Sequence, residues 1–391
     1  MKDIWKADKQ KELNKNRIIG FAIILTLLII IIVISILYIA NTAIRAWIDK
    51  NIFRKEVMQD KVTTIELKEE NTNVYAFNKY IGILNKNEFS IYSNTGNKET
   101  TIEMQVSNPI FDSANRFLVV AENKGKKLYV ISDKDELWNT EVEGDIAQVH
   151  INKNGYVAVV IANTSYKTVI AMFDPDGKEM FKTYLSSTRT ADVSISNDNK
   201  KLAIAEIDTS GSIIQSNIKV ISVEKASSDP TNSLEDTYNG ENNKLITNIK
   251  YQEKNKLVCM YTDSISVIEN GQEATLVDNT NKKTIFQSIE LSDNVVSVEE
   301  KSSGLFTADS IVNIMNVANK NNKEYIANSI TKEMYTYEDI IALNLGTEIE
   351  FINKEGWLVK RYLANQEITN IVVSNNLAGI IYRDKIELIN L

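Results

Sequence analysis

The sequence offers few side chains that could carry out catalysis. It contains one histidine, His150, in IAQVHINKNG, and one cysteine, Cys259, in KLVCMY. A Ser-His-Asp or Cys-His mechanism would have to use His150, because its nucleophile needs an adjacent base. The nucleophile motif G-x-S-x-G is absent. We interpret His150 as structural and Cys259 as a buried thiol, since reactive thiolates occur in polar, electropositive surroundings and this cysteine lies in an apolar run.

Two other patterns could hold a metal ion or a cofactor. Asp174–Glu179, DPDGKE, gathers carboxylates, but a calcium loop needs more ligands at fixed spacing, so the pattern indicates a hairpin turn. Trp138 and Trp357 follow corresponding turns and could form the aromatic floor of a quinone site, but packing between repeats explains them more simply. One histidine and one cysteine are too few for the usual zinc sites. We therefore expect no catalytic, cofactor-binding or metal-binding residues and no cofactor.

An apolar segment near the N-terminus predicts a membrane anchor. Ile18–Ala40 contains 23 residues and no charge, and a helix of that length spans roughly 35 Å, enough for a bilayer core of about 30 Å. A signal peptide has an apolar region of only about 7–15 residues, so we expect an uncleaved transmembrane helix over 18–40. Six Lys/Arg precede it and four follow closely. This bias predicts a cytoplasmic basic tail over 1–17 and a C-terminal body outside the cytoplasm.

Residues 41–60 continue in a helical pattern. Apolar residues at a spacing of three to four line one face of this segment: Ile44, Trp47, Ile48 and Ile52. One interpretation is an interfacial or self-associating helix. The other, which we favour, is a juxtamembrane stalk that extends the membrane helix.

A repeat of short strands occupies residues 61–391. One β-branched strand type returns eight times, beginning at Tyr80, Phe117, Tyr156, Lys201, Lys256, Asn294, Asp339 and Asn376. The copies are 37 to 55 residues apart, a period typical of propellers and helical solenoids, and the strand-like pattern favours the propeller. Each copy is followed by a second strand, a turn and a weaker strand. Each repeat therefore predicts one four-stranded antiparallel blade.

The repeats predict an all-β fold, a single β-propeller with eight blades; seven blades is the alternative. The last copy is one strand short at Leu391, whereas Lys61–Lys68, KVTTIELK, precedes the first full unit and belongs to none. We expect this N-terminal strand to join the last blade, which closes the ring and removes two open sheet edges. The polar stretch Glu224–Lys244 predicts a surface loop around a weak strand.

The turns near the ends of the repeats resemble those of a known class. DPDGKEMF, DKDELW and NKEGWLV resemble the ends of quinoprotein-type repeats, and the ring as a whole is similar to WD-repeat-like and quinoprotein-like propellers. The combination of anchor and propeller resembles an uncharacterised family of membrane-anchored propellers from low-GC Gram-positive bacteria, over essentially the whole chain. This family carries no known activity, so the resemblance implies the layout alone.

Charge and architecture narrow the function. The net charge is −8 although residues 1–17 are basic, and an acidic body argues against nucleic acid as a partner. We predict a non-enzymatic scaffold or sensor at the cell envelope that binds a protein partner. The alternative is an enzyme (a hydrolase, lyase or quinone-type dehydrogenase) with its site in the central channel. Convergent Asp, Glu, Arg and Tyr with shifted pKa values there would favour the enzyme, and a plug of Ala, Val and Gly the scaffold.

Overall fold

The structure is a computed structural model. It describes residues 15–40, 42–53, 55–57, 62–67, 72–211, 214–240, 244–252, 255–269, 271–302, 308–374 and 376–391. The chain forms two compact units, Met1–Glu56 and Val57–Leu391, with the short strand β1 (Glu56–Val57) at their boundary. Most of the predicted basic tail, residues 1–14, lies outside the described residues.

The first unit contains two helices, α1 (Lys15–Ala40) and α2 (Thr42–Asn51). Within Ile19–Ala40 of α1, an 18-residue window has a mean hydropathy of 3.3. The side chains along this stretch are predominantly apolar and exposed, with none of its most apolar part buried inside the protein. By length and composition, α1 can therefore cross a membrane.

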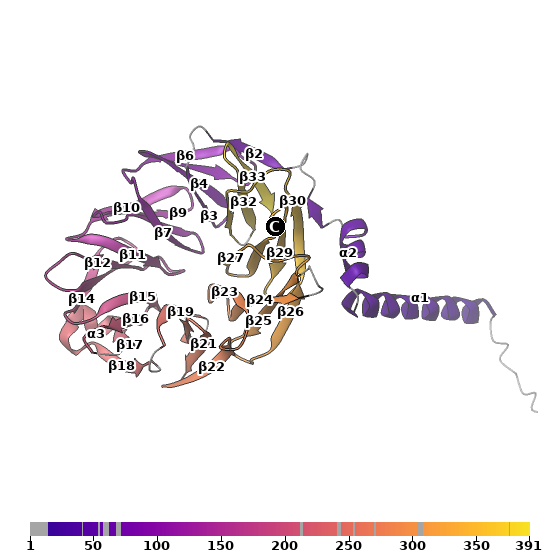
Figure 1. The fold of residues 1–391 in the computed structure, drawn as a ribbon. Helices are drawn as coiled ribbons and strands as arrows, with labels where there is room; N and C mark the ends of the chain where they lie inside the picture. The colour runs from indigo at the N-terminus through magenta and orange to yellow at the C-terminus, as the bar shows by residue number, and fades with distance from the viewer. Residues whose placement is uncertain are drawn as a thin grey trace, which may run out of the picture. The chain divides into compact units, whose positions relative to one another are not determined.

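The second unit is a β-propeller of eight four-stranded antiparallel blades arranged in a ring (Figure 1), which confirms the eight-blade prediction. The strands of blades 1 to 4 are, in turn, β3 (Asn73–Phe77), β4 (Tyr80–Asn85), β5 (Glu88–Ser93) and β6 (Lys98–Glu103); β7 (Pro109–Ala114), β8 (Phe117–Glu122), β9 (Lys127–Ser132) and β10 (Asp135–Glu141); β11 (Asp145–Ile151), β12 (Val157–Ala162), β13 (Thr168–Phe173) and β14 (Glu179–Leu185); and β15 (Arg189–Ile195), β16 (Lys201–Asp208), β17 (Gln215–Ser222) and β18 (Leu234–Asn239).

Blades 5 to 8 follow the same order, in which the first strand of each blade is the innermost. Their strands are β19 (Ile246–Tyr251), β20 (Leu257–Tyr261), β21 (Ser264–Glu269) and β22 (Gln272–Asp278); β23 (Thr284–Ser288), β24 (Asn294–Ser302), β25 (Ala308–Asn316) and β26 (Asn322–Ile326); β27 (Glu333–Tyr337), β28 (Ile340–Asn344), β29 (Glu348–Asn353) and β30 (Leu358–Leu363); and β31 (Asn370–Val373), β32 (Leu377–Ile381), β33 (Lys385–Asn390) and β2 (Thr63–Glu66).

Blade 8 combines strands from both ends of the propeller. The N-terminal β2 pairs antiparallel with β33, and Ile65 lies opposite Ile386. The prediction that an N-terminal strand closes the ring is therefore confirmed, although residues 61 and 68 of the predicted strand lie outside the described residues. Pairing β2 with β33 gives β33 a hydrogen-bonding partner on each side.

Apolar cores lie between neighbouring blades, because each blade buries both of its faces. In β12, Val157, Val159 and Ile161 pack into a core shared with blade 2. The alternate residues Ala158 and Val160 pack into the core shared with blade 4. This two-sided burial explains why the second strands are continuous apolar runs rather than alternating ones. Each large aliphatic side chain buried in this way contributes about 1.5–3 kcal/mol.

The polar segment after β17 contains more regular structure than the sequence predicts. A short helix, α3 (Val223–Ser228), and a 3₁₀ turn, Pro230–Asn232, precede β18. Most residues of β18 are exposed. The predicted weak strand is therefore present at the surface as the outermost strand of blade 4, and α3 is an element that the turn-rich composition concealed.

Candidate functional site

A cavity of about 580 Å³ lies at the centre of the ring. The innermost strands β7, β11, β15 and β19 line it, together with residues that follow β23 and residues around the end of β27. Most of the lining residues stand at the ends of these strands or in the turns that lead to the second strands. The cavity therefore lies toward the end of the ring that carries those turns.

Charged and titratable side chains from six successive blades converge on this cavity. They are Asp112, His150, Lys153, Asp192, Lys250, Glu290 and Glu338. The lining is thus polar, and the apolar plug that a scaffold was expected to have is not what lines this cavity. By residue type, the cavity lining resembles the lining expected of an enzyme. Whether the cavity could support catalysis therefore depends on which of these groups can reach a substrate.

Asp112 joins blade 2 to blade 3. One carboxylate oxygen accepts a hydrogen bond from the backbone N–H of Ser113, and the other accepts one from Ile151 on β11, both at 2.8 Å. Burial raises the pKa of Asp112, an effect that the nearby His150 and the Ile151 amide oppose. Both oxygens are therefore occupied by the backbone.

Asp192 plays the same part between blades 4 and 5. Its oxygens accept hydrogen bonds from the N–H of Val193 at 2.9 Å and of Ile249 on β19 at 2.8 Å. Burial raises the pKa of Asp192, and again His150 opposes this effect. The Nε2 atom of His150 lies 3.2 Å from Asp192 Oδ1 and forms an ion pair with it when the imidazole is protonated. The only histidine thus lines the cavity at a blade seam; its structural role stays a prediction.

Further polar bonds cross the seams beside these acids. Ser194 Oγ accepts from the N–H of Tyr251 at 2.8 Å, which joins blades 4 and 5. Gln252 Nε2 donates to the carbonyl of Leu291 at 3.0 Å, which joins blades 5 and 6. The central acids therefore belong to a set of hydrogen bonds that hold neighbouring blades together, and this role accounts for their burial without catalysis.

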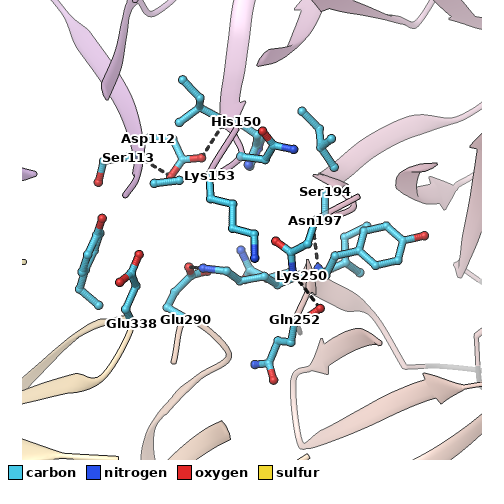
Figure 2. A pocket seen from close by; sticks show the side chains of 18 of the residues that line it. Asp112, Ser113, His150, Lys153, Ser194, Asn197, Lys250, Gln252, Glu290 and Glu338 are labelled. Carbon is cyan, nitrogen blue, oxygen red and sulfur yellow. Dashed lines mark hydrogen bonds and ion pairs between the residues drawn. The ribbon is translucent and has the colours of Figure 1, made fainter. Parts of the chain in front are cut away.

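Lys250 and Glu290 form an ion pair that faces the cavity (Figure 2), and their side chains are 36% and 50% exposed. Burial lowers the pKa of Lys250, but Glu290, together with Asp112 and Glu338, outweighs this effect and the net shift is upward. Burial likewise raises the pKa of Glu290, but Lys250 and His150 together outweigh it, so the net shift is downward. Both groups are consequently charged at neutral pH. Lys153 extends into the same space, and within the described ranges it has no ion-pair partner.

The arrangement is better suited to binding than to proton transfer. A general base needs an oxygen that can reach a substrate proton, and both oxygens of Asp112 and of Asp192 already accept amide protons. Besides these two acids, the acidic and basic side chains that face the cavity are Lys153, Glu338 and the Lys250–Glu290 pair. Together they can contact a polar ligand that carries both signs of charge.

The structure also places the other residues singled out by the sequence. Cys259 on β20 has no exposed surface, and burial raises the pKa of its thiol, so its prediction as a buried thiol is confirmed. In the DPDG turn, one oxygen of Asp174 accepts from the N–H groups of Asp176 at 3.0 Å and Lys178 at 2.9 Å. The turn joins β13 to β14, as the hairpin interpretation required.

The two tryptophans differ in their surroundings. Trp138 packs in the core between blades 2 and 3, with its ring 5.7 Å from that of Phe173 and its Nε1 donating to the carbonyl of Pro175 at 3.0 Å. Trp357 is 42% exposed. Packing between blades therefore explains Trp138, whereas Trp357 is covered only in part and its role in packing stays a prediction.

Comparison with known proteins identifies the fold and a family. Residues 49–391 match the family described as "Family of unknown function (DUF5711)". The structure is similar to BamB from Moraxella catarrhalis, with a TM-score of 0.50, 13% identity, and coverage of 84% of this chain and 99% of that one. It is also similar to the C-terminal WD40 domain of Sif2, with a TM-score of 0.56, 10% identity, and coverage of 83% and 98%. At these identities the likeness shows a propeller fold alone. No curated protein matches the sequence.

Proposed function

Because this chain belongs to that family of unknown function, we propose its role from its own geometry: a membrane-anchored scaffold, without catalysis, whose propeller binds a protein partner. The observation that carries the proposal is the central cavity, in which Asp112 and Asp192 are engaged in bonds between blades while an ion pair and a lysine face the opening. The cavity and the turns around it are the surface that we assign to recognition.

The chemistry of the cavity indicates the kind of segment it would bind. Its volume of about 580 Å³ lies in the range of ligand pockets, about 300–1,000 Å³. Lys153 can pair with a carboxylate of the partner, and the Lys250–Glu290 pair can exchange contacts with groups of either sign. We infer that a polar loop or chain end of the partner, with both acidic and basic groups, enters the cavity.

Site-specific photo-cross-linking tests this assignment. We expect a photo-reactive residue in place of Lys153 to give one discrete cross-linked protein species in native membranes, because its side chain extends into the cavity. Lys178 is the matched control, since it is an exposed lysine of the same blade but belongs to the turn between the outer strands β13 and β14. Equal cross-linking from both positions, or none from either, would contradict the proposal.

An enzyme that acts within the cavity is the second candidate. It is favoured by the raised pKa values of Asp112 and Asp192, because shifted acids in a hollow are common at catalytic sites. The amide bonds to both acids weigh against it. A small substrate in the cavity would leave Lys153 without a protein adduct, so the same experiment separates the two candidates.

We further propose that the N-terminus is cytoplasmic and that the propeller lies outside the cytoplasm at the cell envelope. The support is the six basic residues before the apolar segment against four after it. Cys259 is fully buried, so in a folded Ser186→Cys variant a maleimide reaches only the introduced, exposed cysteine. We expect a membrane-impermeant maleimide to label this variant on intact cells and to leave the parent protein unlabelled. Labelling only after permeabilisation of the cells would show that the propeller is cytoplasmic and would contradict the proposed orientation.

A further inference from the structure

Helices α1 and α2 meet at an elbow that is closed by polar contacts. The hydroxyl of Tyr38, near the end of α1, donates to Asp49 Oδ1 of α2 at 2.7 Å. The Nζ atom of Lys55 lies 2.9 Å from the same oxygen. Asp49 is only 1% exposed, and a buried carboxylate is stable only with such partners. These bonds hold α2 against the last turns of α1.

Arg45 of α2 strengthens the elbow from the other side. Its Nε donates to the carbonyl of Tyr38 at 3.0 Å, and its Nη2 donates to the carbonyl of Ile39 at 2.8 Å. Carbonyls in the last turn of a helix lack partners within the helix. A guanidinium there satisfies them and interacts favourably with the helix dipole. Arg45 thus caps the C-terminus of α1 and at the same time holds the start of α2 against it.

Large apolar side chains are exposed on α2 and on the turn that follows it. Trp47 is 60% exposed, and Ile52 and Phe53 are each 57% exposed. The ring of Phe53 meets that of Tyr38 edge to face, with the centroids 6.0 Å apart. Phe53 is therefore at the level of the last turns of α1, which is where a helix that crosses a membrane reaches the bilayer surface.

We propose that α2 and the turn after it rest on the surface of the bilayer that α1 crosses, with Trp47, Ile52 and Phe53 inserted among the lipid headgroups. The inference rests on the proposed membrane anchoring. It differs from the stalk that we favoured from the sequence, because a stalk would continue along α1, whereas α2 runs across the axis of α1 (Figure 1).

Continuity of the chain and charge both select lipid as the occupant of this face. Only residue 41 separates α1 from α2, so α2 starts at the surface where α1 ends. Tyrosine and tryptophan are enriched at that level of a membrane. In the proposed arrangement, Tyr38 and Trp47 lie at that level. Residues 45–55 also contain four basic residues against one acidic residue, Asp49, and this excess of positive charge complements anionic headgroups.

Depth-dependent quenching of a fluorescent label tests the proposal on the full chain in lipid vesicles. We expect a label on Ile52→Cys to be quenched most by lipids brominated near the headgroup. A label on Ile29→Cys, in the middle of α1, should be quenched most by lipids brominated near the end of the acyl chain. A label on Ser186→Cys, on the propeller surface, should not be quenched. The buried Cys259 stays unlabelled in all three folded variants.

The outcomes separate this inference from the anchoring on which it rests. An unquenched label at position 52 together with deep quenching at position 29 overturns the surface position of α2 and leaves the anchor standing. Absence of quenching at both positions overturns the anchor itself. Asp49→Ala removes the acceptor of the Tyr38 hydroxyl. We therefore expect this variant to lose most of the quenching at position 52 and to keep the quenching at position 29 unchanged. Unchanged quenching in that variant overturns the role of the elbow.

Discussion

A propeller that lacks Lys385–Leu391 is expected to unfold or aggregate, because the deletion removes β33 from the middle of blade 8. Ile386, Leu388 and Ile389 are at most 3% exposed. Burying each of them contributes about 1.5–3 kcal/mol, and the three together approach the whole stability of a typical domain, about 5–15 kcal/mol. The strand also pairs with β32 on one side and β2 on the other, so both ladders are lost.

Thermal unfolding of Val57–Leu391 and its truncated form measures this effect. Asn390→Ala is the control, because Asn390 is an exposed residue of the same strand, and we expect it to change the free energy of unfolding by no more than about 0.5 kcal/mol. Removing β2 should be milder, since Ile65 is its only buried residue. Cooperative melting of the form without β33 within a few degrees of the parent would show that blade 8 does not close the ring.

The unfolding free energy is expected to fall as the pH rises from about 4.5 to about 7, through Glu350 on β29. This residue has no exposed surface. Burial raises the pKa of Glu350 to about 7, although Arg361, with Nη2 3.0 Å from Glu350 Oε1, opposes the rise. Below pH 4.5 the carboxyl is protonated in both the folded and the unfolded chain, so the stabilisation from its tighter proton binding is fully present. Above pH 7 it is lost, at a cost on the order of 3 kcal/mol.

Glu350→Gln should remove this part of the pH dependence. We expect the unfolding free energy of the variant, relative to the parent, to rise by on the order of 3 kcal/mol between pH 4.5 and pH 7.5. The change with pH is the relevant quantity, because the loss of the bond to Arg361 adds a constant offset. Glu348→Gln is the matched control: Glu348 lies on the same strand and 3.3 Å from the same guanidinium, yet this variant retains Glu350. Parallel pH profiles for the parent and Glu350→Gln would show that Glu350 does not titrate in this range.

The blades could be predicted from the sequence because the same physical demand recurs in each of them. The second strand is covered on both faces, so runs such as Phe117–Ala121 and Leu202–Ala205 consist entirely of buried apolar residues. Asparagine, aspartate and glycine in the turns supply backbone angles that few other residues adopt, as at Asn199 and Gly177, both with positive φ. Repetition then multiplies a signal that is weak in any single blade.

The cavity could not be predicted in the same way, because its residues come from six blades and share no local motif. Asp112 and Lys250 are the single charged residues of their innermost strands, and Asp192 shares β15 with one other charged residue, Arg189. Their one common signal is a charge in the first strand of a blade, where the side chain faces the ring centre. The partners of Asp112 and Asp192 are backbone amides, and these leave no trace in residue identity. The exposure of Trp357 could not be predicted for a related reason, since its turn resembles that of the partly buried Trp138.

Because blade 8 is built from strands at both ends of the propeller, the ring can close only after the last strand has been synthesised. Thr63 of β2 pairs with Leu388 of β33, so about 320 residues, or roughly 15–60 s of synthesis, separate the appearance of the two strands. Throughout that interval blade 1 lacks the neighbour that covers Val74 and Ile81, because Leu377 and Ile386 have yet to be made. During synthesis, the apolar face of blade 1 is therefore exposed to proteases, chaperones and other nascent copies of the chain. The risk of aggregation and proteolysis lasts until the last strand docks. A truncating mutation late in the chain would leave the apolar face of blade 1 permanently exposed.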